Sequence, residues 1–540
     1  MLKLSGGQAV VKALAAQGVK AVFGIPGVHN LDIYDALLDT PEIAHFVVRH
    51  EQSASFMADG YARATGEVGV VLLITGPGLT NALTGIAQAY SDSSPLLVIS
   101  SQVASPLADK ERGSLHELRD QLGVVRPVTI YNQRIARPED IFPAVEAALK
   151  CIAEGRPRPI HLEIPTDVLE AITEIAVPEP DGPPASTSCR RPGPDEARIR
   201  RAADLLVRAE HPLMLAGGGC VTAEAGQELL AIADLLQAPI LLTGNGKGAV
   251  PEDHPLVLGN LSYDEALADL MQKSDALLAV GTRFSAMSTR GFSWPVPQRL
   301  VHIDIDPAEI GRNYPAKVGI VSDARLGLAA LYEALQSWVP EPRPSRTAEA
   351  AEIRASARPT LMGEGPWEMA ALKVIRDALA PEDILVNDMT MLSYAAARYY
   401  PVLRPRTFMA PRGYGTLGFS YPAALGAQVG RPDRRVVSIA GDGGFLFTGV
   451  ELATAVQYQL PVVALIVNNQ GYGVVKRNQM RRFGRSIDVD LHTPDYLKMA
   501  EAFGVAAERI SGIDALGSAL ERAFQERRPY IIEMPEPDQL

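Results

Sequence analysis

The chain has 540 residues, of which 47% are hydrophobic and 21% are charged, and its formal net charge is −12. This length is enough for three domains of ordinary size, and the acidic balance argues against nucleic acid or an anionic membrane as a main partner. No apolar run approaches the roughly 18 residues that span a bilayer, and three scattered cysteines without metal-ligand spacing favour reduced thiols in a cytoplasmic protein.

The first third of the chain alternates short β-branched runs with helical patterns, which is typical of a doubly wound parallel sheet. Ser5 precedes an amphipathic stretch and predicts a capped helix. His29 lies in a loop, GIPGVHN, directly after the first expected strand. Glu51 falls where a strand meets a helix N-terminus, a normal place for a functional carboxylate. Strands are expected at residues 21–23, 46–48, 70–74 and 96–100.

Two proline-rich segments, residues 177–194 and 339–366, are predicted to be surface connectors. They divide the chain into domains at 1–176, 195–338 and 367–540, and all three alternate strand and helix patterns. The predicted fold class is therefore α/β, with three doubly wound parallel-sheet domains. Strands are expected at 213–215, 240–242, 276–280 and 300–305 in the central domain, and at 384–386, 436–439, 462–467 and 530–533 in the last.

The outer domains resemble each other at one type of loop. A glycine-rich turn introduces an alanine-rich helix in both, at Ile74–Gly78 and at Gly413–Gly418. We interpret this similarity as an indication of an internal duplication. In the central domain Gly217-Gly218-Gly219 follows the first strand, but a glycine cluster alone is weak support for a bound nucleotide.

The stretch from Gly441 to Asn469 is the most informative in the chain. A buried strand ends at Gly441-Asp442-Gly443-Gly444, where glycine lets the backbone approach a phosphate closely. A helix at 449–459 and a second apolar strand then lead to Asn468-Asn469, so one crossover is expected to bring Asp442 and Asn469 to neighbouring strand ends. A carboxylate, an amide and the carbonyl of Gly471 suit Mg²⁺, which would bridge a diphosphate.

This spacing resembles the signature of enzymes that depend on thiamine diphosphate (ThDP). The order of the domains resembles the pyrimidine-binding (PYR), central and diphosphate-binding (PP) layout of the pyruvate oxidase and acetolactate synthase-like branch. The stretch around Glu51, RHEQSASFMADGYAR, is similar to the family's glutamate segment. The resemblance implies that Glu51 hydrogen-bonds the aminopyrimidine ring and activates ThDP. It also implies active sites at the interface of a homodimer or homotetramer.

The resemblance extends to the other cofactor contacts. The Gly413–Gly418 loop is similar to the segment that binds the aminopyrimidine, which implies that Leu417 wedges beneath the bent cofactor. The implied cofactor-binding residues are Glu51, Asp388, Thr390, Gly415, Leu417, Gly441, Gly443, Gly444 and Asn469, and the implied Mg²⁺ ligands are Asp442, Asn469 and Gly471.

The substrate side departs from acetohydroxyacid synthases. They carry Phe-Gln-Glu where this chain has Leu115-His116-Glu117, and Ile130 stands where they have a lysine. Benzaldehyde lyase has a histidine at the position of His29, so His29 is the candidate for proton transfer and His116 is a second. Together the segments most resemble decarboxylases of 5-guanidino-2-oxopentanoate. A guanidinium substrate calls for a carboxylate, and the candidates are Glu117 and Asp120, which could equally be surface acids.

The implied activity is ThDP- and Mg²⁺-dependent, non-oxidative decarboxylation of a small 2-oxo acid. One alternative is a carboligase, similar to acetolactate synthase or benzaldehyde lyase, that joins the decarboxylated unit to a second carbonyl compound. An inactive regulatory subunit and a flavin-dependent oxidase of the same branch are further alternatives. Because Leu258–Ser262 replaces the family's flavin-binding segment, FAD is not expected.

Overall fold

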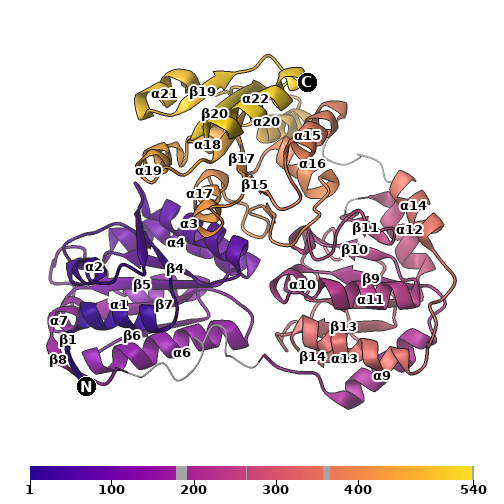
Figure 1. Ribbon diagram of the computed structural model, residues 1–540, viewed down its shortest axis with the longest axis horizontal. Helices are drawn as coiled ribbons and strands as arrows, with labels where there is room; N and C mark the ends of the chain where they lie inside the picture. Colours follow the sequence, from indigo (N-terminus) through magenta and orange to yellow (C-terminus); the bar gives the residue numbers. More distant parts are fainter. Residues whose placement is uncertain (178–190, 263, 357–364, 538–540) are drawn as a thin grey trace.

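The computed structural model describes residues 1–177, 191–262, 264–356 and 365–537. Within these ranges the chain forms three six-stranded parallel sheets, which we call the first, central and last blocks (Figure 1). Each sheet has a different apolar core on each of its two faces, as the doubly wound prediction requires. No helix in these ranges is both long enough and apolar enough to cross a membrane.

The first block has the strand order β3-β2-β4-β5-β7-β6. All four strands expected here are present, and Ser5 caps the first helix in a reciprocal capping box with Gln8. The sheet strands are β2 (Ala21–Gly24), β3 (Ala44–Val47), β4 (Gly69–Leu73), β5 (Leu96–Gln102), β6 (Tyr131–Arg134) and β7 (Ile160–Pro165), with β1 (Leu2–Ser5) and β8 (Ile172–Ile175) paired apart. The α-helices are α1 (Gly6–Ala16), α2 (Leu31–Leu38), α3 (Glu51–Thr65), α4 (Pro77–Asp92), α5 (Gln121–Val125), α6 (Ile141–Glu154) and α7 (Thr166–Glu170).

The last block repeats the topology of the first. Its order is β16-β15-β17-β18-β20-β19, so strands at equivalent chain positions occupy equivalent places in the two sheets. This agreement supports the internal duplication. Its strands are β15 (Ile384–Asn387), β16 (Phe408–Met409), β17 (Val436–Gly441), β18 (Val463–Asn468), β19 (Ala506–Arg509) and β20 (Tyr530–Pro535). Its α-helices are α15 (Pro366–Ala378), α16 (Met391–Tyr399), α17 (Ser420–Gly430), α18 (Asp442–Phe445), α19 (Leu452–Gln457), α20 (Gly473–Phe483), α21 (Tyr496–Phe503) and α22 (Ile513–Glu526).

The central block has a different order, β11-β10-β9-β12-β13-β14. This arrangement is the one found in dinucleotide-binding sheets, in which the strand order reverses beside the first strand. Its strands are β9 (Pro212–Ala216), β10 (Ile240–Leu242), β11 (Val257–Gly259), β12 (Ala276–Val280), β13 (Leu300–Asp304) and β14 (Val318–Val321). Its α-helices are α9 (Glu196–Val207), α10 (Gly218–Thr222), α11 (Gly226–Leu236), α12 (Glu265–Lys273), α13 (Ala324–Gln336) and α14 (Thr347–Ser356).

Two local predictions need correction. The second predicted connector contains a helix, α14, which is anchored because Arg354 donates hydrogen bonds to the carbonyls of Pro255 and Val257. The helix expected at 449–459 is a 3₁₀ turn, η4 (Gly449–Glu451), followed by the short α19. Residues 178–190 of the first connector and 357–364 of the second lie outside the described residues, and the exact domain boundaries stay predictions.

Helices α3 and α17 occupy equivalent positions in the two outer blocks and pack directly against each other (Figure 1). Gly60 of α3 faces the carbonyl of Ala423, and Gly426 of α17 faces the carbonyl of Met57. A Cβ atom at either glycine would come closer to that oxygen than a van der Waals contact allows. The backbones can therefore approach this closely only because both positions lack a side chain, and one apolar core continues across the contact.

Candidate active site

Three neighbouring strands of the last block end beside one another and form the first half of the site. Gly441 ends β17, Asp388 follows β15, and Asn469 follows β18. The backbone N–H of Gly471 donates to Oδ2 of Asp442 at 3.0 Å, which brings Asp442 to the turn after Asn469. This is the convergence that the Gly441 to Asn469 spacing predicted.

The buried Asp442 carboxylate is suited to hold a cation. Its side chain lies among backbone N–H groups, and burial raises the pKa of its carboxyl above the ordinary value. Asn469 donates through Nδ2 to Glu536 at 2.6 Å, which leaves its Oδ1 without a described partner. In the described ranges no three His, Cys, Asp or Glu side chains gather into a metal site. A cation here would thus need Asp442, the Asn469 amide, a backbone carbonyl and ligand oxygens, a set that suits Mg²⁺.

The predicted diphosphate contacts surround this position. A Cβ at Gly441 would lie 3.2 Å from Thr390, and one at Gly444 would lie 3.5 Å from Asp388. A Cβ at Gly443 would crowd the ring of Tyr472 at 2.8 Å. The lack of side chains at these glycines therefore keeps the backbone accessible to a closely approaching phosphate.

The side chains of Asp388 and Thr390 already have structural partners. Asp388 accepts from the N–H groups of Met389 at 2.8 Å and of Ser420 at 3.1 Å. Thr390 caps α16 by accepting from the N–H of Ser393 at 3.1 Å. These two residues can therefore offer a ligand mainly their backbone groups.

The glycine-rich loop before α17 borders the same space. Gly415 and Gly418 adopt positive φ angles of 75° and 78°, which favour glycine. A Cβ at Gly444 would lie 3.9 Å from Cδ2 of Leu417, so Leu417 stands next to the diphosphate-loop candidates. Its half-buried side chain is available to support a ligand.

The second half of the site lies in the first block. Glu51 is the first residue of α3, and Asn81 of α4 donates to its Oε2 at 2.9 Å. Oε1 has no hydrogen-bond partner in the described residues and lies beside Gly78. One carboxylate oxygen is thus fixed, and the other can accept a further hydrogen bond.

His29 and His116 lie together, as the prediction required. Their ring centroids are 5.3 Å apart in an edge-on arrangement. Burial, with a smaller contribution from His116, lowers the pKa of His29. His116 has a φ of 64°, a strained conformation for a residue with a side chain, and such strain clusters at functional sites. The structure therefore brings the two candidate histidines together, and their role stays a prediction.

The two predicted substrate carboxylates have local partners. Oε2 of Glu117 accepts from the N–H groups of Gly113 at 2.9 Å and Ser114 at 3.0 Å. Asp120 caps α5 through the N–H of Gly123 at 2.7 Å. Oε1 of Glu117 is shielded from solvent, and the carboxylate lies among backbone N–H groups of its own loop. Neither carboxylate therefore points freely to a ligand in this arrangement of the loop.

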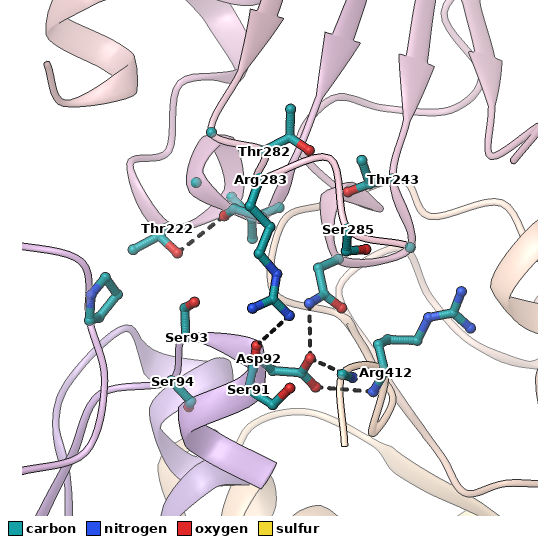
Figure 2. Close-up of a pocket in the computed structure, with 18 of the residues that line it drawn as sticks. Ser91, Asp92, Ser93, Ser94, Thr222, Thr243, Thr282, Arg283, Ser285 and Arg412 are labelled. Atoms are coloured by element: carbon teal, nitrogen blue, oxygen red, sulfur yellow. Dashed lines mark hydrogen bonds between the residues drawn. The ribbon is translucent and has the colours of Figure 1, made fainter. Parts of the chain in front are cut away.

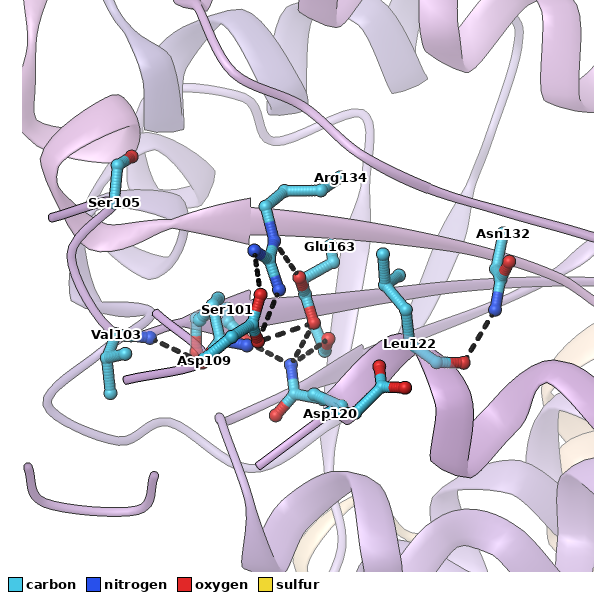
Figure 3. A network of polar contacts seen from close by, with 12 residues as sticks. Ser101, Val103, Ser105, Asp109, Asp120, Leu122, Asn132, Arg134 and Glu163 are labelled. Atoms are coloured by element: carbon cyan, nitrogen blue, oxygen red, sulfur yellow. Dashed lines mark hydrogen bonds and ion pairs between the residues drawn. The ribbon is translucent and has the colours of Figure 1, made fainter. Parts of the chain in front are cut away.

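A polar network anchors the long loop that carries these residues (Figure 3). Arg134 of β6 pairs with Asp109 through two hydrogen bonds of 2.7 and 3.0 Å and with the buried Glu163 of β7. Glu163 also accepts from Nε2 of Gln121 at 2.9 Å. Because Asp109 lies near the start of the loop and Gln121 follows its end, the network holds both ends.

Glu451 joins the two outer blocks next to Glu51. Its carboxylate accepts from the N–H of Arg49 at 3.1 and 3.2 Å, two residues before Glu51. Tyr458, at the end of α19, accepts from the N–H of Val47 at 2.8 Å. The segment before Glu51 is therefore held by residues that follow the diphosphate motif, although no hydrogen bond of the described residues joins Glu51 itself to that motif.

A cavity of about 680 Å³ lies where the three blocks meet (Figure 2). Asp92, at the end of α4, accepts from Asn245 of the central block at 3.1 Å. The same carboxylate accepts from the N–H groups of Arg412 at 3.0 Å and Gly413 at 2.8 Å, in the last block. Asp92 therefore links all three blocks and fixes the start of the Gly413–Gly418 loop.

Several of these residues were not predicted from the sequence. Asn81, Glu451 and Asp92 act through tertiary contacts between segments far apart in the chain. So does Thr75, whose Oγ1 lies 3.0 Å from Nδ1 of His29. Thr75 was the most accessible to sequence reasoning, because it belongs to the glycine-rich turn that resembles the Gly413–Gly418 loop.

Family models of thiamine pyrophosphate enzymes match all three blocks. The N-terminal TPP binding domain matches residues 4–124, the central domain 199–331 and the C-terminal TPP binding domain 388–534. Three similar proteins are each 37% identical to this chain over 98% of its length. They are a probable acetolactate synthase large subunit of Methanocaldococcus jannaschii (92% of its length covered), a probable 2-ketoarginine decarboxylase, AruI, of Pseudomonas aeruginosa (94%), and the acetolactate synthase isozyme 3 large subunit of Escherichia coli (93%).

Proposed function

Because this chain belongs to the thiamine pyrophosphate enzymes, we propose that it decarboxylates a small 2-oxo acid, without oxidation, using ThDP and Mg²⁺. The observation that carries the proposal is the meeting of Asp442, Asn469 and Gly471 at the ends of β17 and β18. When bound, ThDP supplies the carbanion that attacks the keto carbon and the electron sink that accepts the electrons left by CO₂.

The chain's own residues have separate roles in this proposal. Asp442, the Asn469 amide and the Gly471 carbonyl hold Mg²⁺, while the backbone around Gly441, Gly443 and Gly444 receives the diphosphate. Backbone groups of Asp388 and Thr390 add to that cradle.

Binding and activation of the ring portion fall to other residues. The backbone of Gly415 would bind the aminopyrimidine, and the side chain of Leu417 would support the bound cofactor. Oε1 of Glu51 hydrogen-bonds the aminopyrimidine while Asn81 fixes its other oxygen. His29 and His116 line the side at which the substrate arrives.

We further propose that the active unit is a homodimer or larger, in which Glu51 of one subunit serves the diphosphate site of another. The exposed apolar side chains of Leu446, Phe447 and Val450, which directly follow the diphosphate motif, support this.

The substrate we favour is 5-guanidino-2-oxopentanoate, for whose guanidinium Glu117 and Asp120 are the candidate carboxylates. The similar P. aeruginosa protein bears the name of a 2-ketoarginine decarboxylase. A carboligase reading has equal support in the relatives named as acetolactate synthases. His116 and Ile130 at the substrate side favour the decarboxylase. We expect no flavin to take part, and a yellow preparation with flavin absorbance would contradict this.

The direct test is CO₂ release by the purified protein with ThDP and Mg²⁺, offered 5-guanidino-2-oxopentanoate, pyruvate and benzoylformate in parallel. A strong preference for the guanidino acid with its aldehyde as product is expected. Acetolactate formed from pyruvate would favour the carboligase instead. Inactivity on all three would show that none of these three 2-oxo acids is the substrate and would contradict the substrate that we favour.

Asp442→Asn is expected to weaken Mg²⁺-dependent ThDP binding by at least about 10- to 100-fold, the range known for groups that surround a bound metal. Quenching of intrinsic fluorescence on titration with ThDP at saturating Mg²⁺ measures it. Asp490→Asn is the matched control, because Asp490 lies nearby but pairs with Lys476 on the surface. Equal affinities for both variants would remove Asp442 from the metal site.

A further inference from the structure

His29 is the first member of a short hydrogen-bonded chain that runs into the core of the first block. Its Nδ1 lies 3.0 Å from Oγ1 of Thr75, and that oxygen lies 3.0 Å from Oγ of Ser101. The N–H of Thr75 also donates to Oγ of Ser101 at 3.0 Å. Thr75 and Ser101 are completely buried, and Ser101 lies in the polar region shown in Figure 3.

Only one placement of the two hydroxyl protons gives both of them an acceptor among the described residues. If Ser101 donates to Thr75, then Thr75 donates to Nδ1 of His29 and every hydroxyl proton has an acceptor. If Thr75 donates to Ser101 instead, His29 must donate through Nδ1, and the proton of Ser101 has no acceptor among the described residues. Leaving a buried hydroxyl proton without an acceptor costs enough free energy to favour the first arrangement by about tenfold or more.

We propose that Thr75 and Ser101 hold His29 as the tautomer protonated on Nε2, so that His29 acts as a hydrogen-bond donor at the site rather than as a base. Nε2 has no partner among the described residues and is not enclosed, so its N–H is directed to open space. Burial lowers the pKa of His29 and so favours this neutral ring at neutral pH.

The chain of hydroxyls orients His29 but cannot supply it with protons. A proton lost from Nε2 would have to be replaced at Nδ1 by Thr75, and Thr75 by Ser101, whose own proton has no source in the described structure. His29 therefore keeps its proton and donates a hydrogen bond. Resting on the proposed function, its acceptor is the keto oxygen of the 2-oxo acid, which gains negative charge when the neighbouring carbon is attacked.

His116 does not compete for Nδ1, because in the described residues the hydrogen-bond partner of Nδ1 is Thr75 and no hydrogen bond joins the two histidine rings. The two rings therefore leave the Thr75 contact intact. Thr75 is a positioning residue in this scheme, and His29 is the group that touches substrate.

The test is the tautomer of His29 in cofactor-free, ¹⁵N-histidine-labelled protein at neutral pH. The chain has nine histidines, and a His29→Asn variant identifies the signal. Wild type should show the proton on Nε2 only. Thr75→Val, which removes the hydroxyl at nearly constant volume, should show a measurable Nδ1–H population, and Thr75→Ser should match wild type. The inference would be overturned if His29 of the wild-type protein carried its proton on Nδ1, or if Thr75→Val left the tautomer unchanged.

Steady-state kinetics of the holoenzyme give the second readout. Thr75→Val should lower kcat about tenfold and leave KM within about twofold, because the hydrogen bond that His29 donates stabilises mainly the transition state. Thr75→Ser should restore kcat. If Thr75→Val does not fold, Thr75→Ala, which also removes the hydroxyl, replaces it with the same expected tautomer shift. Because the tautomer is read without cofactor, an Nε2–H signal in a protein inactive on 2-oxo acids would defeat the proposed function alone.

Discussion

Replacing Glu51 by glutamine is expected to lower turnover by about 10²- to 10⁴-fold, the range that a positioned acid–base group contributes. The amide oxygen can still accept from Asn81 and keep the helix start in place, whereas the neutral side chain cannot favour the activated form of the ring. ThDP affinity and the circular dichroism spectrum should stay close to those of wild type. A variant with wild-type turnover would remove Glu51 from cofactor activation.

A mixing experiment connects this prediction to the proposed interface. If Glu51 of one subunit serves Asp442 of another, a hybrid of Glu51→Gln and Asp442→Asn subunits contains one intact site. Random re-association of equal amounts should then restore about a quarter of the wild-type activity in a dimer with twofold symmetry. No recovery, with subunit exchange confirmed by mass, would place both residues in the same subunit's site.

The second large effect concerns stability. Gly426→Ala is expected to destabilise the protein by more than about 3 kcal/mol, or to prevent folding, because the new methyl group overlaps the carbonyl of Met57 on the facing helix. Urea unfolding followed by tryptophan fluorescence measures the change. Backbone atoms of two long helices cannot move aside as a flexible side chain would.

Gly517→Ala is the matched control for this prediction. Gly517 also lies inside a helix, but a Cβ there would meet Val374 at an ordinary distance of 3.6 Å. Alanine is the better helix former by about 1 kcal/mol, so this variant should be neutral or slightly more stable. Similar losses in both variants would show that the contact at Gly426 is not tight in solution.

The sequence predicted the buried strands well and the edge strands poorly. Eleven of the twelve expected strands lie in the interiors of the sheets, where burial on both faces produces continuous apolar runs. The twelfth, β3, is an edge strand, and one buried interior strand, β7, was not predicted. Edge strands such as β6, with the sequence YNQR, and β19, with AAER, lack such a run because one side meets solvent. Their pairing depends on a neighbouring strand, which no local pattern reveals.

The residues of the candidate site likewise divide into those that a local pattern predicts and those that it does not. The spacing from Asp442 to Asn469 was informative because a single crossover fixes which strand ends are adjacent, and the hydrogen bond to Gly471 confirms the expected convergence. Asn81 could not be found in this way, since its contact with Glu51 depends on how two helices from separate strands pack. The cap formed by Thr390 is visible only once α16 is seen to start there.

The junction at Asp92 limits how freely the three parts of this chain could be exchanged with those of relatives. Its carboxylate holds Asn245 of the middle part and the backbone of Arg412 and Gly413 at once. A chimaera with a foreign middle part that lacks an amide at position 245 would leave one oxygen of Asp92 short of a donor, next to the loop that leads to Leu417. Recombination at the connectors would therefore need to transfer this pair together.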